Sequence, residues 1–194
     1  MIRVLVVDDH PAVLTGLVVA LRGEPGIVPI AGVATSEEAL SEARRFDIDL
    51  ALVDYHLPDS DGLTLCQELK ALDPPPKVLV YSAFAGMGLS VSARVAGADG
   101  LIDKGVATDA LLEAIRRIWR GGDAMPAVTP EHMEAAVARL DESDLPIVSM
   151  LASEVTREDI AQTLDMPLAE LGDRLVAILK RLRRRAPAYQ PGLH

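Results

Sequence analysis

The sequence predicts an α/β fold, a five-stranded doubly wound parallel sheet, followed by a second, smaller all-α domain. Up to residue 121, short apolar runs alternate five times with segments whose apolar residues recur at helical spacing. Such alternation is typical of a parallel sheet with helices on both faces. The segment 121–126, Gly-Gly-Asp-Ala-Met-Pro, is rich in turn residues and has the composition of a linker. Beyond it, apolar residues recur only at helical spacing, which predicts a separate helical domain.

The first strand and helix lie at the N-terminus. Residues 2–7 are apolar apart from Arg3 and too few for a helix, so they predict a buried strand. Pro11 suits the first turn of a helix, where no backbone donor is needed, and Gly23 is expected to end that helix. By the same reasoning, strands are expected at 26–34, 49–53, 77–81 and 100–102, and helices at 36–45, 60–72, 88–96 and 108–120.

The second half of the chain is expected to form four helices. Thr156 opens one of them with a pattern that resembles a capping box, in which Asp159 replaces the usual Glu. The four segments are 130–140, 143–152, the stretch after Thr156 and the stretch after Pro167. The predicted boundaries are 1–121 for the α/β domain, 122–129 for the linker, 130–185 for the helical domain and 186–194 for a flexible tail.

Composition and charge restrict the class of protein. The chain carries 19 basic and 29 acidic residues, so its formal net charge is −10. Nucleic-acid binding favours a basic balance, so DNA binding would depend on a local cationic patch. The single Cys66 excludes an internal disulfide and suits a reducing compartment. The N-terminus does not resemble a signal peptide and no apolar run approaches membrane-spanning length, so we expect a soluble, cytoplasmic protein without membrane association.

Polar side chains follow four of the predicted strands, at the point where each strand ends. Asp8 and Asp9 follow the first strand, Asp54 the third, Ser82 the fourth and Lys104 the fifth. Because the carboxyl ends of parallel strands meet at one edge of a sheet, we expect these side chains to lie close together. The sequence therefore predicts one polar site at this edge.

The types of residue in this group suggest phosphoryl chemistry. Three neighbouring carboxylates repel one another unless a cation neutralises them, and oxygen ligands favour Mg²⁺ over zinc. A Lys ammonium and a Ser hydroxyl suit a phosphoryl group, and Asp54 would be the nucleophile that forms an aspartyl phosphate. Taken singly, each residue has an ordinary alternative, because an Asp after a strand often caps a helix and a lone Lys is usually a solvated charge.

Four motifs resemble those of response-regulator receiver domains of the NarL/FixJ type, which have a flavodoxin-like fold: Val7-Asp8-Asp9-His10-Pro11, Val53-Asp54-Tyr55, Ser82-Ala83 and Gly100-Leu101-Ile102-Asp103-Lys104. The resemblance covers residues 1–121. It implies that Asp54 accepts a phosphoryl group from a sensor histidine kinase, and that Ser82 and Lys104 contact this group. It also implies that Asp8 and Asp9 are the acidic pair for Mg²⁺, with Asp9, Asp54 and the backbone carbonyl of His56 as direct ligands.

Two residues depart from the receiver pattern. Leu101 stands where the family usually has Tyr or Phe as an output switch, and a leucine has no ring to rotate between exposed and buried positions. Gly105 stands where many receivers have a proline after the lysine. We therefore expect the aromatic part of the usual signal coupling to be absent from position 101.

Residues 141–185 resemble a LuxR-type helix-turn-helix, through Leu151-Ala152 and the stretch 159–166. The resemblance places the DNA-reading helix from Leu168 onward, but Glu170, Gly172 and Arg174 stand where the family commonly has Thr, Lys and His. The candidate DNA-binding residues are Arg174, Lys180, Arg181, Arg183 and Arg184. The alternative role of the cationic run from Lys180 to Arg185 is to stabilise the C-terminal end of a helix. The family's fourth helix has no counterpart in the tail.

Together these features predict a response regulator of a two-component phosphorelay, phosphorylated on Asp54, that regulates transcription through a DNA-binding helix-turn-helix. The first alternative is a degenerate helix-turn-helix that binds a protein such as RNA polymerase or another regulator. A homodimer is a further expected assembly. We do not expect an enzyme. The rival class, aspartate-nucleophile phosphatases, requires an Asp two residues after the nucleophile, where this chain has His56.

Overall fold

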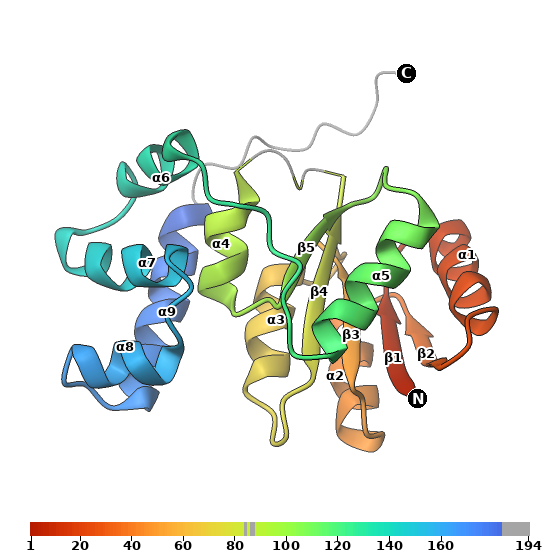
Figure 1. Ribbon diagram of the computed structural model, residues 1–194. Coiled ribbons are helices and arrows are strands. Elements are labelled where there is room, and N and C mark those ends of the chain that lie inside the picture. Colours follow the sequence, from red (N-terminus) through yellow and green to blue (C-terminus); the bar gives the residue numbers. More distant parts are fainter. Residues whose placement is uncertain (84, 86–87, 184–194) are drawn as a thin grey trace.

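The computed structural model describes residues 1–83, 85 and 88–183, and it contains the predicted parallel sheet (Figure 1). The strands lie in the order β2-β1-β3-β4-β5, and every neighbouring pair is parallel. This order places β1, β3 and β4 inside the sheet, so their carboxyl ends lie side by side. The strands are β1 (Ile2–Val7), β2 (Ile27–Val33), β3 (Leu50–Asp54), β4 (Lys77–Ser82) and β5 (Gly100–Asp103).

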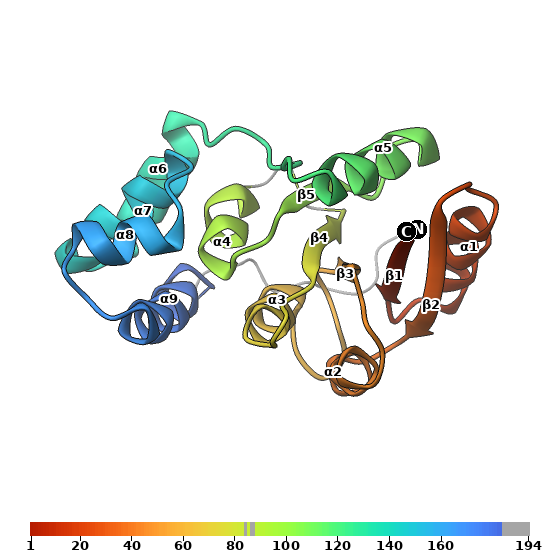
Figure 2. The ribbon, with the colours of Figure 1, turned by 60° about the horizontal axis from the view of Figure 1, so that its bottom comes forward.

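Helices cover both faces of the sheet, because inner-strand residues alternate between two apolar cores. Val4 and Val6 pack with α1 and α5, whereas Leu5 and Val7 pack with α2, α3 and α4. Figure 2 shows α1 and α5 on one side of the sheet and α2 and α3 on the other. The α/β architecture is therefore confirmed. The helices are α1 (Pro11–Arg22), α2 (Ser36–Arg45), α3 (Gly62–Lys70), α4 (Leu89–Ala96) and α5 (Thr108–Trp119).

The loop after β3 fixes the start of the following helix. Asp61 caps α3, since its Oδ1 accepts hydrogen bonds from the backbone N–H groups of Leu63 (3.0 Å) and Thr64 (3.1 Å). The next residue, Gly62, lies against the backbone of β3, where a Cβ would collide with the carbonyl oxygen of Asp54. Position 62 therefore requires glycine if α3 is to begin this close to Asp54.

The second half of the described chain is helical, as predicted. Asp141 and Asp144 cap each other's backbone in a capping box around a short 3-10 helix, Glu142–Asp144, so α7 begins two residues later than the predicted helix start at 143. The first helix ends at Val137 rather than at 140. The α-helices are α6 (Pro130–Val137), α7 (Leu145–Ala152), α8 (Arg157–Thr163) and α9 (Leu168–Arg183). The predicted flexible tail, 186–194, lies outside the described residues.

The helical part packs on α4 and shares a core with the α/β part. Val91 and Val95 of α4 belong to the same apolar cluster as Ile178 of α9. Arg157 of α8 reaches over the end of α4, where its Nη2 donates to the carbonyl oxygen of Val95 (3.2 Å). Arg94 of α4 also pairs with Glu154, at 3.2 Å. These contacts join residues that are about sixty positions apart, so α4 has helices on one side and the sheet on the other (Figure 1).

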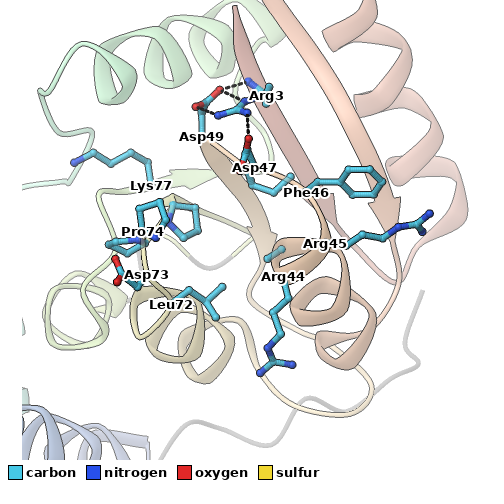
Figure 3. Close-up of a pocket in the computed structure, with 14 residues that line it drawn as sticks. Arg3, Arg44, Arg45, Phe46, Asp47, Asp49, Leu72, Asp73, Pro74 and Lys77 are labelled. Atoms are coloured by element: carbon cyan, nitrogen blue, oxygen red, sulfur yellow. Dashed lines mark hydrogen bonds and ion pairs between the residues drawn. The ribbon is translucent and has the colours of Figure 1, made fainter.

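A hollow at the amino ends of the strands contains charged side chains that pair with each other (Figure 3). Arg3 Nη2 lies 2.9 Å from Asp49 Oδ1, and Arg3 Nη1 lies 3.0 Å from Asp47 Oδ2. The hydrogen bond from Arg3 lowers the pKa of Asp49 despite its partial burial. The charged residues that the sequence analysis singled out lie instead at the carboxyl ends of the strands.

Among the described residues, none of the helices has the length and apolar content needed to cross a bilayer.

Candidate functional site

The structure brings the polar residues at the strand ends together, as predicted from the parallel sheet. Lys104, which follows β5, holds two carboxylates at once. Its Nζ lies 2.7 Å from Asp54 Oδ2 and 2.7 Å from Asp8 Oδ2. Ser82 ends the intervening strand and is fully buried. These four residues come from strands that are neighbours in space, although residues 8 and 104 are 96 positions apart.

Burial controls the electrostatics of the central carboxylate. Asp54 is 3% exposed, and this burial raises its pKa, while the Lys104 ammonium opposes the rise. The backbone N–H of His56 also donates a hydrogen bond to Asp54, which favours the ionised form. Burial disfavours the charged form of Lys104, but its hydrogen bonds to Asp54 and Asp8 outweigh that effect and raise its pKa. Lys104 is therefore a positive charge at neutral pH, fixed beside a partly desolvated carboxylate.

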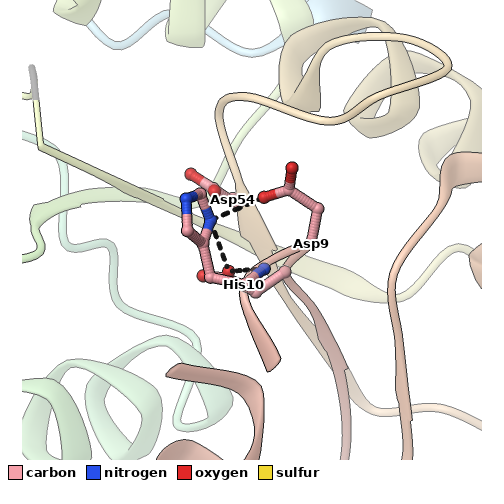
Figure 4. A group of neighbouring side chains, drawn as sticks. Asp9, His10 and Asp54 are labelled. Carbon is pink, nitrogen blue, oxygen red and sulfur yellow. Dashed lines mark hydrogen bonds and ion pairs between the residues drawn. The ribbon is translucent and has the colours of Figure 1, made fainter. Parts of the chain in front are cut away.

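The acidic residues form a group that fits a divalent cation (Figure 4). Asp8, Asp9, His10 and Asp54 each offer one ligand atom, and these atoms lie within 4.8 Å of one another. Asp9 Oδ1 is buried and accepts no hydrogen bond, although His10 Nδ1 lies 2.6 Å away as a possible charge partner. A buried carboxylate oxygen without a hydrogen bond is costly unless a cation occupies its vicinity. Oxygen-rich ligands of this kind suit Mg²⁺.

His10 is a member of this group that the sequence did not single out. Its backbone N–H donates to Asp8 Oδ1 (2.9 Å), and its ring nitrogen Nδ1 lies 3.3 Å from the same oxygen. The side chain is 62% exposed, so it forms the solvent side of the site. In the sequence, the position of His10 directly after Asp8 and Asp9 could have indicated that it lies beside them. Of the predicted metal ligands, His56 lies in the loop after β3, where it forms a β-bridge with Asp61.

Of the candidate DNA-binding residues that the structure describes, most contact acidic or polar groups of the same chain. Arg174 and Arg181 of α9 both pair with the buried Asp144, at 3.2 and 2.8 Å. Arg183 pairs with Asp61 and donates to the hydroxyl of Thr64, so it reaches α3. Lys180 is exposed. Arg184 lies outside the described residues.

The exposed surface of the first half of α9 is apolar and acidic. Leu168 is 50% exposed and Val176 is 38% exposed, and the side chains between them include the exposed acids Glu170 and Asp173. A helix-turn-helix that binds DNA is expected to present cations on the exposed side of this helix, where they can contact phosphates. The described part of α9 instead directs Arg174, Arg181 and Arg183 towards its own chain.

Residues 4–116 match the response regulator receiver domain family. "Response regulator UvrY" of Escherichia coli (strain K12) is 27% identical over 176 residues, which cover 86% of this chain and 81% of that protein. "DNA-binding transcriptional activator DevR/DosR" of Mycobacterium tuberculosis is 25% identical over 197 residues, covering 95% and 91%. The structure of RcsB from Salmonella enterica serovar Typhimurium, bound to the promoter P1flhDC with the phosphomimetic BeF3−, has a TM-score of 0.62 at 19% identity and covers 96% of this chain and 94% of that one.

A doubly wound sheet that gathers three carboxylates, a lysine and a serine at its carboxyl edge defines the receiver class of signalling domain. The chain belongs to the response regulator receiver domain family, and it is a two-component response regulator with a receiver domain and additional C-terminal helices.

Proposed function

We propose that a sensor histidine kinase phosphorylates this protein on Asp54, and that the phosphorylated protein regulates transcription by binding DNA through its C-terminal helices. The observation that supports the first part best is the bridge that Lys104 Nζ forms between Asp54 and Asp8. It keeps a positive charge beside Asp54, the buried carboxylate at the end of the central strand β3. The relatives' names and the promoter-bound RcsB structure support the second part.

The side chains have distinct roles in phosphoryl transfer. An Asp54 carboxylate oxygen attacks phosphorus, so a new O–P bond forms while the N–P bond to the kinase histidine breaks and the imidazole leaves. Lys104 stabilises the negative charge on the phosphoryl oxygens, and the Ser82 hydroxyl donates a hydrogen bond to one of them. Asp9 and Asp54, together with the backbone carbonyl of His56, would hold Mg²⁺, which neutralises charge on the transferred group when bound.

Labelling with a small phosphodonor tests the acceptor. Incubation with acetyl phosphate and Mg²⁺ should add one phosphoryl group to the protein, and Asp54→Asn should abolish the label because the amide is not a nucleophile. Asp59→Asn is the matched control, since Asp59 lies in the same loop but caps α2 through the backbone N–H groups of Ser36 and Glu37. Intact mass and an acid-labile phosphate assay give the readout. Label that persists in Asp54→Asn would refute the assignment.

A second candidate function is binding of a protein partner by the same helices. The pairing of Arg174 and Arg181 with the buried Asp144 favours it, because a positive charge that is neutralised within the chain attracts phosphates less strongly. Leu168 and Val176 also expose apolar area on α9 that a protein surface would cover. RNA polymerase or another regulator is the kind of partner we expect in that case.

Salt-dependent titration of labelled duplex separates the two functions. If the helices bind DNA, affinity should fall steeply with salt, and Lys180→Glu should weaken binding and reduce the salt slope by about one. Lys77→Glu is the control, because Lys77 pairs with Asp99 at the far edge of the sheet. We expect BeF3− to change affinity only weakly, because the buried Leu101 has no ring to switch. No binding at low salt would favour the protein partner.

The homodimer and the absence of turnover also remain predictions. Two copies that assemble on a symmetric DNA site would follow the pattern typical of helix-turn-helix regulators. An aspartate-nucleophile phosphatase requires an Asp at the position of His56. We therefore expect no hydrolysis of phosphate esters, apart from loss of the phosphoryl group from the protein itself. Release of p-nitrophenol from p-nitrophenyl phosphate measures this directly.

A further inference from the structure

Lys104 must direct its ammonium at Asp54, yet the backbone that follows it has little intrinsic stiffness. The next residue is Gly105, and glycine has the least restricted backbone of all residues. On the other side of Lys104, its own N–H donates to the carbonyl oxygen of Ser82 over 3.1 Å, which continues the ladder between β4 and β5. Only contacts beyond that ladder can fix the peptide group between Lys104 and Gly105.

Tyr81 supplies the first of these contacts. Its hydroxyl donates to the carbonyl oxygen of Lys104 over 3.2 Å, and its ring centroid lies 5.5 Å from Lys104 Nζ. Burial raises the pKa of Tyr81, so the phenol stays protonated and remains a donor. Tyr81 also pairs with Asp54 across the ladder between β3 and β4. Tyr81 therefore connects the strand pair that positions Asp54 with the backbone of Lys104.

Asp103 supplies the second contact. Its Oδ1 accepts a hydrogen bond from the N–H of Gly105 over 2.7 Å, and its carbonyl oxygen accepts one from the N–H of Val106 over 3.2 Å. This is a turn closed by an aspartate side chain, a common way to order a flexible turn. The peptide group between Lys104 and Gly105 thus has its oxygen held by Tyr81 and its nitrogen held by Asp103.

We propose that Tyr81 is a positioning residue for phosphoryl recognition, and that Tyr81 and Asp103 form a clamp on the Lys104–Gly105 peptide that keeps the ammonium within reach of a phosphoryl group on Asp54. The clamp orders Lys104, because without it the flexible backbone of Gly105 would allow the turn to change conformation. Since it takes Asp54 as the acceptor, this inference rests on the proposed function.

Tyr81 has a second environment that would account for a purely structural role. Its ring lies in a groove between α1 and α5, where Leu17, Val106 and Leu111 also line the surface. Packing in the groove depends on the ring, whereas the clamp depends on the hydroxyl. Tyr81→Phe keeps the first and removes the second, so it separates the two roles.

Binding of BeF3− with Mg²⁺ to the full-length protein provides the test, because BeF3− stands in for the phosphoryl group. We expect Tyr81→Phe to weaken BeF3− binding about fivefold, the effect of one hydrogen bond, while the affinity for Mg²⁺ alone stays unchanged. The control, Tyr55→Phe, removes the same atom from the neighbouring loop and should change neither affinity. Asp103→Ala should also weaken BeF3− binding, and the double variant should lose less than the product of the two effects.

Amide hydrogen exchange tests the clamp without any phosphoryl group. In Tyr81→Phe, exchange at Gly105 should accelerate, while the amides of β1 and β3 should keep their protection. If the unsubstituted protein fails to bind BeF3−, the proposed function is refuted and the exchange measurement still decides on the clamp. If it binds BeF3− but Tyr81→Phe matches Tyr55→Phe in affinity and in Gly105 exchange, Tyr81 acts only in packing and the clamp is refuted.

Discussion

Asp8 and Asp9 are adjacent in sequence but have different surroundings. Asp8 is 1% exposed and pairs with Lys104, so its charge is already compensated within the protein. Asp9 Oδ1 is buried without a hydrogen bond, and the exposed His10 ring lies 2.6 Å from it. At the scale of single residues, the pair therefore divides into a carboxylate that holds the lysine and a carboxylate that is available for a metal.

Thermal unfolding with and without Mg²⁺ should reveal this division. A ligand that binds only the folded state stabilises it by mass action, so we expect saturating Mg²⁺ to raise the Tm of the unsubstituted protein. Asp9→Asn should lose most of this rise, because it removes the available ligand. Asp8→Asn should keep more of it, although its basal Tm should fall with the loss of the buried pair to Lys104. Equal Mg²⁺ shifts in both variants at matched ionic strength would contradict the assignment.

At the scale of helices and strands, the site depends on how closely α3 starts behind β3. Gly62 allows the first turn of α3 to touch the carbonyl of Asp54, and Asp61 caps that turn. By contrast, Gly172 in α9 has open space where a Cβ would be. The same residue type thus has a steric role in one helix and none in the other.

Alanine at the two glycines should have opposite effects. Gly62→Ala should destabilise the protein by about 1–3 kcal/mol, as overpacking does, and should slow labelling of Asp54 because the acceptor strand must shift. Gly172→Ala should stabilise by up to about 1 kcal/mol, because alanine is the better helix former and meets no neighbour. Urea unfolding gives both free energies of unfolding. A neutral Gly62→Ala would show that α3 adjusts without moving Asp54.

At the scale of the whole molecule, α4 joins the receiver domain to the C-terminal helices. It buries Val91, Val95 and Ala96 between the sheet and α7 and α9. Arg157 closes the joint at the end of α4, where a cation also complements the helix dipole. Gly97 has a positive φ of 86° and lies under the guanidinium, so a side chain at position 97 would displace Arg157. The two parts therefore share one apolar core.

Loss of Arg157 should loosen this joint. A shared core predicts a single cooperative thermal transition for the unsubstituted protein, since neither part can expose its side of the core without cost. We expect Arg157→Ala to broaden or split that transition and to speed proteolysis in the segment 121–129. Arg44→Ala removes the same side chain from an exposed position at the end of α2 and should change neither property. An unchanged protease pattern in Arg157→Ala would argue against its part in the joint.

Local patterns along the chain were sufficient to determine the sheet, its flanking helices and the position of the polar site at the strand ends. Strand periodicity and polar strand ends are properties of short segments, and a parallel sheet converts them into one site by geometry. This is why Asp54 and Lys104 could be assigned to one place before any contact was known, while helix ends such as Val137 differed by a few residues.

Only the tertiary structure decided the environment of the cations on α9 and the partner of α4. Arg181 belongs to the cationic run 180–185 of the sequence and Arg174 precedes that run, but Asp144, thirty or more residues earlier, determines their contacts. Likewise, the pattern of α4 could not specify which helices cover its second apolar side. Such pairings depend on how remote segments meet in three dimensions, and neither charge nor periodicity within one segment contains that information.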